Sequence, residues 1–192
     1  MGPNVKFTKE QIIDVAFEIA KTEGIDGITM RKIAEQMGSS VAPIYVNFKN
    51  VDELNEALIE RIISVSQRLL SEESSGNQFY DIGRASLRFA SEYSAIFRDL
   101  VMKNNSRIKV YDEKIIPALI EQMKKDPELE GFTVDELKAI LLKMKIFQLG
   151  LSVMVANGLL PKDYEIQDLM DLLSSAANDV ILSARLSKSL LK

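Results

Sequence analysis

The strongest constraint on this chain is the spacing of its apolar residues, which recur every three or four positions along almost its whole length. Such spacing gathers apolar side chains on one face of an α-helix, whereas a half-buried strand alternates apolar and polar residues. No long stretch alternates with a period of two, and the chain holds only 9 Gly and 5 Pro to interrupt helices. The sequence therefore predicts an all-α protein.

Composition narrows the possible functions. With 192 residues, 46% of them hydrophobic, the chain can bury a sizeable core without covalent or metal staples. Cys and His are both absent, which excludes disulfide scaffolds, zinc fingers, iron–sulfur clusters and nucleophile pairs built on His. No phosphate-binding Gly loop or metal-ligand cluster stands out. We therefore expect no cofactor, no metal and no enzymatic activity.

Charge and hydropathy bear on partners and location. The chain carries 24 Lys and Arg against 28 Asp and Glu, a formal charge of −4, so any basic surface must be local. Residues 1–6 contain no apolar leader segment, and the nearly apolar run at 146–156 is shorter than a membrane span of roughly 18 residues. We expect a cytoplasmic protein with no membrane partner.

Capping signals divide the helical pattern into segments. Thr8 with Gln11, and Thr133 with Glu136, have the spacing of capping boxes, and Asn50 supplies a further cap. Gly24 and Gly38 are suited to end helices. Together with the apolar spacing, these signals predict helices near 8–23, 30–37, 40–48, 51–70, 78–91, 94–103, 107–125, 133–156 and 163–190.

The first 50 residues have the dimensions of a helix-turn-helix. Three short helices are predicted there, and Gly38-Ser39-Ser40 joins the last two, with Ser40 as the expected cap of the third. Phe48 is expected in the core of this small domain. Because many small bundles also pack two helices across a Gly turn, spacing alone leaves both a DNA-binding and a plain bundle interpretation open.

The residue pattern adds a resemblance. The string from Thr29 to Gly38, followed by Ser40, Ile44-Tyr45, Phe48-Lys49 and Asp52-Glu53-Leu54, resembles the N-terminal domain of TetR/AcrR-family transcriptional regulators, and the match covers residues 8 to about 58. The resemblance implies a helix-turn-helix DNA-binding domain at 1–50 and a helical effector-binding and dimerisation domain at 51–192. The implied function is a ligand-responsive regulator, a repressor by expectation, on a palindromic operator.

The resemblance also implies DNA-contacting residues. In the family the third helix enters the major groove of double-stranded DNA, where small hydroxyls reach bases and apolar groups reach thymine methyls. Tyr45 would bond a phosphate, although it could instead be a core aromatic residue. Thr29 would bond a phosphate or act only as a cap. The implied contacts are Thr29, Arg31, Ser39, Ser40, Val41, Ala42, Ile44, Tyr45 and Lys49, with Lys32 and Lys6 as further nearby cations.

Some features depart from the family pattern. Asn47 stands where the family often has His or Tyr, and Pro43 lies in the expected recognition helix. Residues 1–50 carry six Lys and Arg against six Asp and Glu, so their net charge is zero and few phosphates would be neutralised. This near-neutral surface leaves open an alternative, a helical ligand- or protein-binding module whose N-terminal domain no longer binds DNA.

Two functions are expected of the remaining helices. A recognition helix reads too few bases alone, so we expect a homodimer in which the last two helices of each copy meet; an ordinary monomeric core is the alternative. The predicted dimer residues are Leu151, Val155, Leu169, Leu173, Ala176, Ala177, Val180, Ile181 and Ala184.

The effector is expected to be a small, mainly apolar organic molecule, because the middle helices offer an adaptable apolar lining. The predicted ligand-binding residues are Phe89, Tyr93, Phe97, Leu100, Met123, Met144, Phe147 and Gln148. The amide of Gln148 lies on an apolar stripe and needs a partner, which could be a ligand, its counterpart in a dimer or a neighbouring side chain. Ligand occupancy would favour a tilt of the helix at 51–70 that resets the recognition helices.

Overall fold

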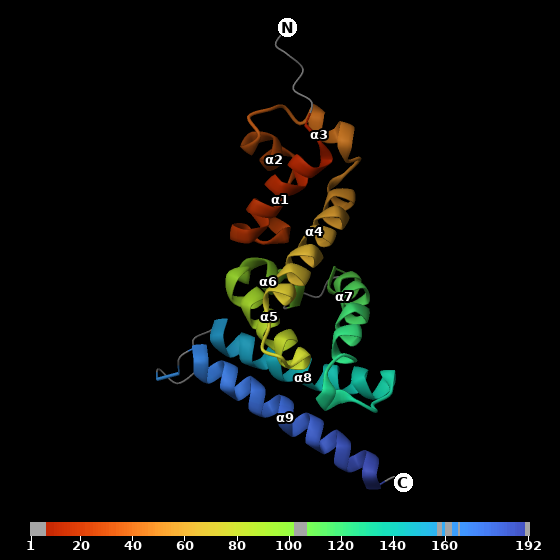
Figure 1. Cartoon of the computed structure of the whole chain (residues 1–192). Coiled ribbons are helices and arrows are strands. Elements are labelled where there is room, and N and C mark those ends of the chain that lie inside the picture. The colour runs from red at the N-terminus through yellow and green to blue at the C-terminus, as the bar shows by residue number, and fades with distance from the viewer. Residues whose placement is uncertain (1–6, 102–106, 157–158, 160–162, 165, 191–192) are drawn as a thin grey trace. The chain divides into compact units, whose positions relative to one another are not determined.

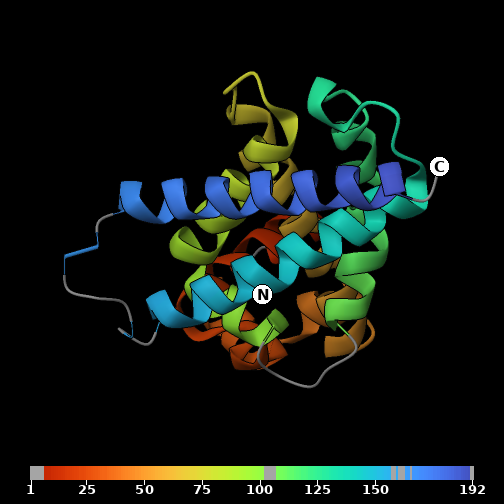
Figure 2. The same cartoon turned by 90° about the horizontal axis from the view of Figure 1, so that it is seen from below.

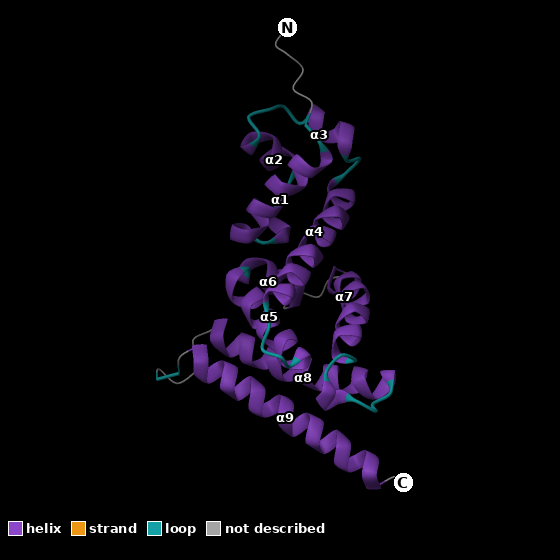
Figure 3. Ribbon diagram, in the orientation of Figure 1, coloured by secondary structure: helices purple, strands orange, loops and turns teal. Residues whose placement is uncertain are grey.

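The computed structural model describes residues 7–101, 107–156, 159, 163–164 and 166–190, with side chains for all of these except 107–108, 155–156 and 166. Within these residues the helices are α1 (Lys9–Glu23), α2 (Met30–Gln36), α3 (Ala42–Asn47), α4 (Val51–Glu72), α5 (Gln78–Glu92), α6 (Ser94–Val101), α7 (Arg107–Met123), α8 (Val134–Ala156) and α9 (Ile166–Leu190) (Figure 1). Two 3-10 turns, η1 (Ile25–Gly27) and η2 (Pro127–Leu129), interrupt the loops. The described residues contain no strand, which confirms the all-α prediction (Figure 3).

Both predicted capping boxes are present. The Thr8 hydroxyl accepts from the Gln11 N–H at 3.2 Å, and the Gln11 side chain accepts from the Thr8 N–H at 3.0 Å. At the start of α8 the Thr133 hydroxyl accepts from the Glu136 N–H at 3.3 Å, and the Glu136 carboxylate accepts from the Thr133 N–H at 2.6 Å. Each box satisfies two backbone donors that the first helical turn leaves open, which explains why these helices begin where they do.

The start of α3 corrects one prediction. Ser40 was expected to cap this helix, but the capping position is Val41, and no side chain bonds the first turn. Pro43 lies in that turn and has no N–H, so one of the donors that a cap would satisfy is missing. The helix therefore begins without a side-chain cap, and the Ser40 side chain stays exposed.

Packing divides the chain into two compact units. The first comprises the residues up to Gln67 together with Glu92–Glu113, and the second comprises Arg68–Ser91 together with Lys114–Lys192. Helices α4 and α7 contribute to both units. The functional division predicted at residues 50 and 51 stays a prediction, because packing identifies compact segments and not the activity of each.

The core of the first unit lies among α1, α2, α3 and the start of α4 (Figure 1). The predicted core residue Phe48 is only 2% exposed, which confirms its assignment. The fully buried aliphatic side chains of this core come from all four helices and from η1: Ile12, Ile19, Ile25, Ile33, Ile44, Leu54, Leu58 and Ile62. A domain this small depends on each of them, since burying one such side chain contributes about 1.5–3 kcal/mol.

The core of the second unit lies among α5, α7, α8 and α9. Helices α8 and α9 lie side by side (Figure 2), and each faces the core with one apolar stripe. Gly83 of α5 sits against Leu173 of α9 so closely that a Cβ at Gly83 would lie 2.8 Å from a Leu173 methyl. The absence of a side chain at Gly83 is therefore what lets α5 approach α9.

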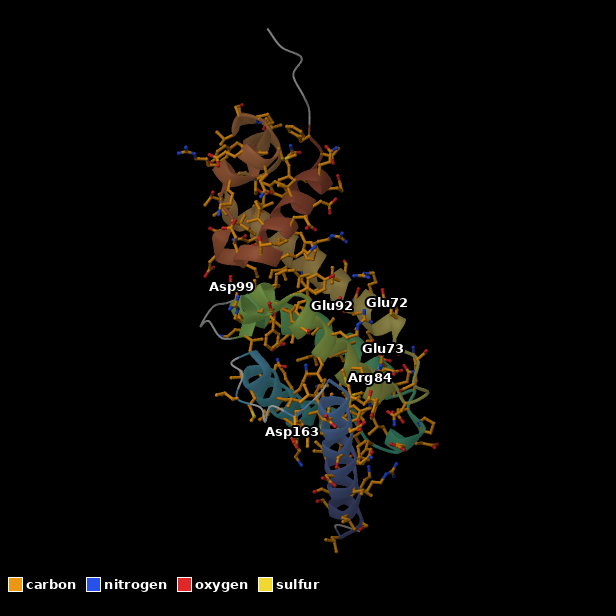
Figure 4. The ribbon with its side chains drawn as sticks, turned by 90° about the vertical axis from the view of Figure 1, so that its left-hand side faces the viewer. Glu72, Glu73, Arg84, Glu92, Asp99 and Asp163 are labelled. Atoms are coloured by element: carbon orange, nitrogen blue, oxygen red, sulfur yellow. The ribbon has the colours of Figure 1, made fainter. Side chains whose placement is uncertain are left out.

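An ion-pair cluster joins the end of α4 to α5. The Glu73 side chain, 8% exposed, accepts from Arg84 Nε at 2.8 Å and from Arg88 Nη1 at 3.0 Å (Figure 4). Burial raises the pKa of Glu73, but the hydrogen bonds from Arg84 and Arg88 outweigh burial and hold that pKa below its ordinary value. Glu73 is therefore a charged, well-satisfied group.

Among the described helices, none combines the length and the unbroken apolar run that a membrane span requires.

Candidate nucleic-acid interface

The turn between α2 and α3 has helix-turn-helix geometry. After α2 ends at Gln36, Gly38 adopts φ +62°, a left-handed conformation that favours glycine. The Gly38 N–H donates to the Glu35 carbonyl at 3.1 Å, and the Ser39 N–H donates to the Ala34 carbonyl at 2.9 Å. These bonds end α2 and redirect the chain into α3 within five residues, from 37 to 41.

The short helix α3 has one buried face and one exposed face. Ile44 and Phe48 are 0% and 2% exposed and anchor the helix in the first unit. Val41, Tyr45 and Val46 are 39%, 53% and 85% exposed. Exposed apolar side chains on a six-residue helix bury nothing within the chain, so they are available to a partner.

The structure corrects the prediction made for Ile44. This residue was predicted to approach base edges, but its side chain is fully buried and has no accessible surface to offer DNA. The neighbouring predicted contacts differ in exposure: Ser40, Val41, Ala42 and Tyr45 are exposed, and Ser39 is half-buried. Tyr45 is thus not the core aromatic residue of the alternative interpretation.

The prediction missed Val46, the most exposed residue of the large apolar side chains on this helix. A β-branched apolar residue between Tyr45 and Asn47 was the available signal, but the family pattern carried over no role for position 46. Asn47 itself turns inward: its Nδ2 donates to the carbonyls of Phe7 at 3.2 Å and Pro43 at 3.0 Å. It therefore fastens the chain before α1 to α3.

Carboxylates accompany most cations near α3. Arg31 Nε lies 2.9 Å from the Glu35 carboxylate, with side chains 85% and 62% exposed, so a phosphate can replace Glu35 at little cost. Lys32 pairs with Glu23. In the part of the first 50 residues that the structure describes, the Lys49 ammonium forms no ion pair within 4.0 Å; only its backbone N–H is held, by Glu53 at 2.8 Å. Lys6 lies outside the described residues.

The hydroxyl oxygen of Thr29 caps α2 as an acceptor, and the same hydroxyl can also act as a donor. Its hydroxyl oxygen accepts from the Lys32 N–H at 3.1 Å at the start of α2. The hydroxyl can still donate its proton to a partner in solvent, because Thr29 is exposed. The predicted roles as cap and as phosphate donor are therefore compatible, and only the cap is confirmed.

The predicted effector-binding residues fall into both units. Tyr93, Phe97 and Leu100 belong to the first, where the Tyr93 ring packs on Phe17 with centroids 5.8 Å apart. The other five belong to the second: Phe89, Met123, Met144, Phe147 and Gln148. Phe147 and Gln148 are half-buried, whereas Met123 and Met144 are core residues. Their binding of an effector stays a prediction.

The predicted dimer residues require a correction. Leu151, Leu169, Leu173, Ala177 and Ile181 are 4–8% exposed and belong to the core of the second unit. Their partly buried neighbours pack against the same core: Ala176, Val180 and Ala184. The five buried side chains have little surface to offer a second copy, whereas dimer contacts of the half-buried Ala176, Val180 and Ala184 stay a prediction. The side chain of Val155 lies outside those described.

A different apolar surface of α8 and α9 is exposed. On α8, Leu142 and Ile146 are 58% and 65% exposed, and Gly150 follows four residues later in open space. On α9, Leu172, Leu182 and Leu186 are 39%, 59% and 64% exposed. These residues are exposed and do not belong to the core of the second unit, and we call them the outer stripe. The sequence offered one signal for these residues: Leu142 and Ile146, and likewise Leu182 and Leu186, lie four positions apart, which places each pair on one side of its helix.

A hollow of about 400 Å³ opens at the start of α9, and none of the predicted effector-binding residues lines it. Its lining is mostly polar or acidic: Asp163, Tyr164, Asp168, Asp171, Leu172 and Ser175. Three carboxylates make this hollow a poor site for an apolar molecule. No group of three Asp or Glu side chains among the described residues is placed to hold a metal ion.

Known proteins resemble both the interface and the whole fold. Residues 12–58 match the family model described as bacterial regulatory proteins, tetR family. The chain is 36% identical over 59 residues to the class D tetracycline repressor protein of Escherichia coli, which covers 31% of this chain and 27% of that protein. It is 26% identical over 148 residues to the nucleoid occlusion factor SlmA of Haemophilus influenzae, with coverage of 69% and 68%.

The fold also matches a solved regulator. The transcriptional regulator FadR from Bacillus subtilis, solved in complex with stearoyl-CoA, superposes with a TM-score of 0.59 at 19% identity, over 91% of this chain and 98% of that one. The match to the first curated repressors is much shorter, since it spans only 23% and 27% of their lengths. The likeness to FadR extends to the fold of both units.

Proposed function

The chain belongs to the TetR family of bacterial regulatory proteins, and we propose that it is a ligand-responsive repressor that binds a palindromic operator as a homodimer. The observation that carries this proposal is α3, which exposes Val41, Tyr45 and Val46 while Ile44 and Phe48 hold it in place. A helix of this size, presented after a helix-turn-helix bend, fits the major groove of double-stranded DNA.

Base reading is assigned to the exposed side of α3 and the residues just before it. The hydroxyls of Ser39 and Ser40 can donate to or accept from several bases. Val41 and Ala42 offer methyl groups to thymine, and Val46 extends that apolar surface. We expect modest base selectivity from each contact, because none of these side chains can bond one base through two hydrogen bonds.

Phosphate binding is assigned to residues around α3. The Tyr45 hydroxyl and the Thr29 hydroxyl each supply one donor. Among the residues that the structure describes, no carboxylate pairs with the Lys49 ammonium, which supplies one cation, and Arg31 supplies another once it leaves Glu35. Because these cations are few, we expect contacts with DNA phosphates to orient the protein on the duplex more than they add to its affinity.

The homodimer is assigned to the outer stripe. Two half-sites on one side of the duplex require two copies related by a two-fold axis. Leu142 and Ile146 on α8, with Leu182 and Leu186 on α9, expose large apolar side chains that a second copy could bury. Open space at Gly150 allows a partner helix to come close to α8.

The effector is proposed to be a mainly apolar organic molecule. The Met and Phe side chains among the predicted residues can rearrange around an apolar guest. Support comes from FadR, which has a similar fold and was solved with a ligand whose acyl chain is apolar. Binding of the effector would favour some orientations of α4 over others and so change the affinity for the operator.

The DNA-binding proposal is tested by fluorescence anisotropy on a palindrome from the promoter of the protein's own gene. We expect sequence-specific binding that falls about tenfold in Tyr45→Phe, the loss of one hydrogen bond to a charged group, and further in Tyr45→Ala. Tyr164→Ala is the matched control, because Tyr164 is similarly exposed at 44% but lies in the second unit.

Two outcomes would contradict the proposal. Equal affinity for the palindrome and for scrambled DNA would favour a helical module that no longer reads DNA. If Tyr45→Ala binds the palindrome with the affinity of the wild type, α3 is not part of the DNA interface. Effector dependence is measured separately, by mass spectrometry of co-purified small molecules and by their effect on the anisotropy. The SlmA match makes this separation necessary, since that relative is named for nucleoid occlusion and covers more of the chain.

A further inference from the structure

The carboxylate of Asp99 on α6 is buried against the start of the loop that precedes the helix-turn-helix. Asp99 is 4% exposed, and its Oδ2 accepts from the backbone N–H of Asp26 at 3.1 Å. A Cβ built on Gly24 would lie 2.3 Å from the same oxygen. Figure 4 marks Asp99 on α6, which belongs to the same compact unit as α1, α2 and α3.

The identity of Gly24 follows from two independent requirements. Its φ of +82° lies in the region that favours glycine, and its missing side chain leaves the space that the Asp99 carboxylate fills. Any other residue at 24 would strain the backbone and displace α6 from α1. The sequence signal, a helix-ending glycine, points only to the first requirement.

The Asp26 amide is a donor that needs a partner. It lies in η1, whose first N–H groups have no acceptor within the turn, and Ile25 beside it is 1% exposed. The Asp99 carboxylate satisfies that amide from outside the segment. In return, the hydrogen bond reduces the cost of burying a charged group.

The loop held in this way leads directly into the helix-turn-helix. Residues 24–28 connect α1 to Thr29, the cap of α2, and α2 leads through Gly38 into α3. A second contact lies next to the start of α6, where the Tyr93 ring packs on Phe17 of α1. Helix α6 therefore contacts both the body of α1 and the loop that orients α2.

We propose that Asp99 is a positioning residue for DNA binding: it fixes the loop at 24–28 so that α2 and α3 keep their orientation on α1. Asp99 touches no DNA itself, because it is buried. Through this carboxylate α6 is joined directly to the loop that leads into α2. The proposal rests on the proposed function for its effect on the operator, but the fixing of the loop is independent of it.

The test compares Asp99→Ala with Asp99→Asn, which keeps an oxygen acceptor for the Asp26 amide. Loss of a hydrogen bond to a charged group predicts that operator affinity falls roughly tenfold in Asp99→Ala and less than threefold in Asp99→Asn. Hydrogen exchange at the amides of residues 25–32 should accelerate in the unbound Asp99→Ala protein and stay near the wild-type rate in Asp99→Asn.

Asp126→Ala is the matched control. Asp126 is a buried carboxylate in the second unit, 2% exposed, that accepts from the Phe79 N–H at 3.0 Å and the Glu128 N–H at 2.9 Å. Its loss should lower stability without changing either operator affinity or exchange at 25–32. This control separates positioning from a general loss of stability.

The outcomes distinguish the inference from the proposed function. If the wild type binds no operator, the proposed function fails, and faster exchange at 25–32 in Asp99→Ala still supports the fixing of the loop. Wild-type exchange at these amides in Asp99→Ala, or operator affinity equal to wild type, overturns the inference. If Asp99→Ala does not fold, exchange of the Asp26 amide in the wild type decides: a rate like that of an exposed amide overturns it, and strong protection supports it.

Discussion

Helices α3 and α9 both expose apolar side chains, but they differ in length and in how each is held. Helix α3 has 6 residues, and its two anchors, Ile44 and Phe48, leave one way to pack it. Helix α9 has 25 residues with apolar side chains on more than one side, so either stripe is a possible core face. In both helices the packing of the surrounding chain, and not the apolar pattern alone, decides which apolar side chains are buried.

The largest effect is expected from charging the outer stripe. The double variant Leu182→Glu with Leu186→Glu places carboxylates on an apolar surface that a second copy would bury, which is strongly unfavourable. We expect a monomer in sedimentation velocity and a loss of operator affinity of at least about a hundredfold, since only one half-site is then engaged.

Val134→Glu is the control for this variant. Val134 is 42% exposed at the start of α8, away from the outer stripe, and a carboxylate there suits the positive end of the helix dipole. It should leave both association and DNA binding unchanged. A double variant that still sediments as a dimer would move the interface elsewhere.

The next effect separates the two faces of α3. Ile44→Ala removes a fully buried side chain and should lower the free energy of unfolding by about 3 kcal/mol. Val46→Ala removes a side chain that is 85% exposed and should change it by less than about 0.5 kcal/mol. Urea unfolding measures both values, and anisotropy should show weaker operator binding for folded Val46→Ala. Equal destabilisation by the two substitutions would contradict the assigned orientation.

A smaller effect concerns phosphate contacts. Each neutralised phosphate adds about −0.9 to the slope of log affinity against log salt, and we expect a modest slope for the wild type. Lys49→Gln should reduce the slope by about one per subunit, because its ammonium has no carboxylate partner. Lys21→Gln, which breaks a pair with Glu18, should not change it. A wild-type slope near −9, implying about ten contacts, would contradict this assignment.

The smallest effect is on the pH dependence of stability. The hydrogen bond from Lys188, and then that from the Thr133 N–H, lower the pKa of Glu136 from 4.5 to about 2. A carboxyl whose pKa is lower in the folded state stabilises the fold above pH 4.5 and loses that contribution as the pH falls toward 2.

Acid titration of stability tests this contribution. Glu136→Gln should be less stable than wild type at pH 7, and the difference should shrink below pH 4.5. Glu130→Gln is the control, since Glu130 is exposed and near the same end of α8. A stability difference that persists unchanged down to pH 2 would show that Glu136 acts through something other than its charge.

The sequence predicted the helices well because their ends depend on neighbouring residues. Capping boxes at Thr8 and Thr133, and the glycine at 38, place helix ends from information within a few positions. The turns η1 and η2 were not predicted, and the Ser40 cap was wrong because Pro43 removes the need for one. Local chemistry thus accounts for the boundaries but not for every loop.

The candidate site was less predictable because it depends on contacts distant in the chain. Burial of Ile44 and exposure of Val46 follow from how α3 packs on α1 and α2, which no local signal reports. Asp99 meets Asp26 across 73 positions of sequence. On α8 and α9, five residues predicted at a dimer interface are instead buried in the core of their own chain.

The most direct test of the central claim is hydroxyl-radical footprinting of the operator bound to the wild type and to Tyr45→Ala. We expect two protected segments on one side of the duplex, one helical turn or a multiple of it apart, with two chains per operator. Both segments should disappear together in Tyr45→Ala. A single protected segment, or protection that Tyr45→Ala leaves intact, would contradict the account.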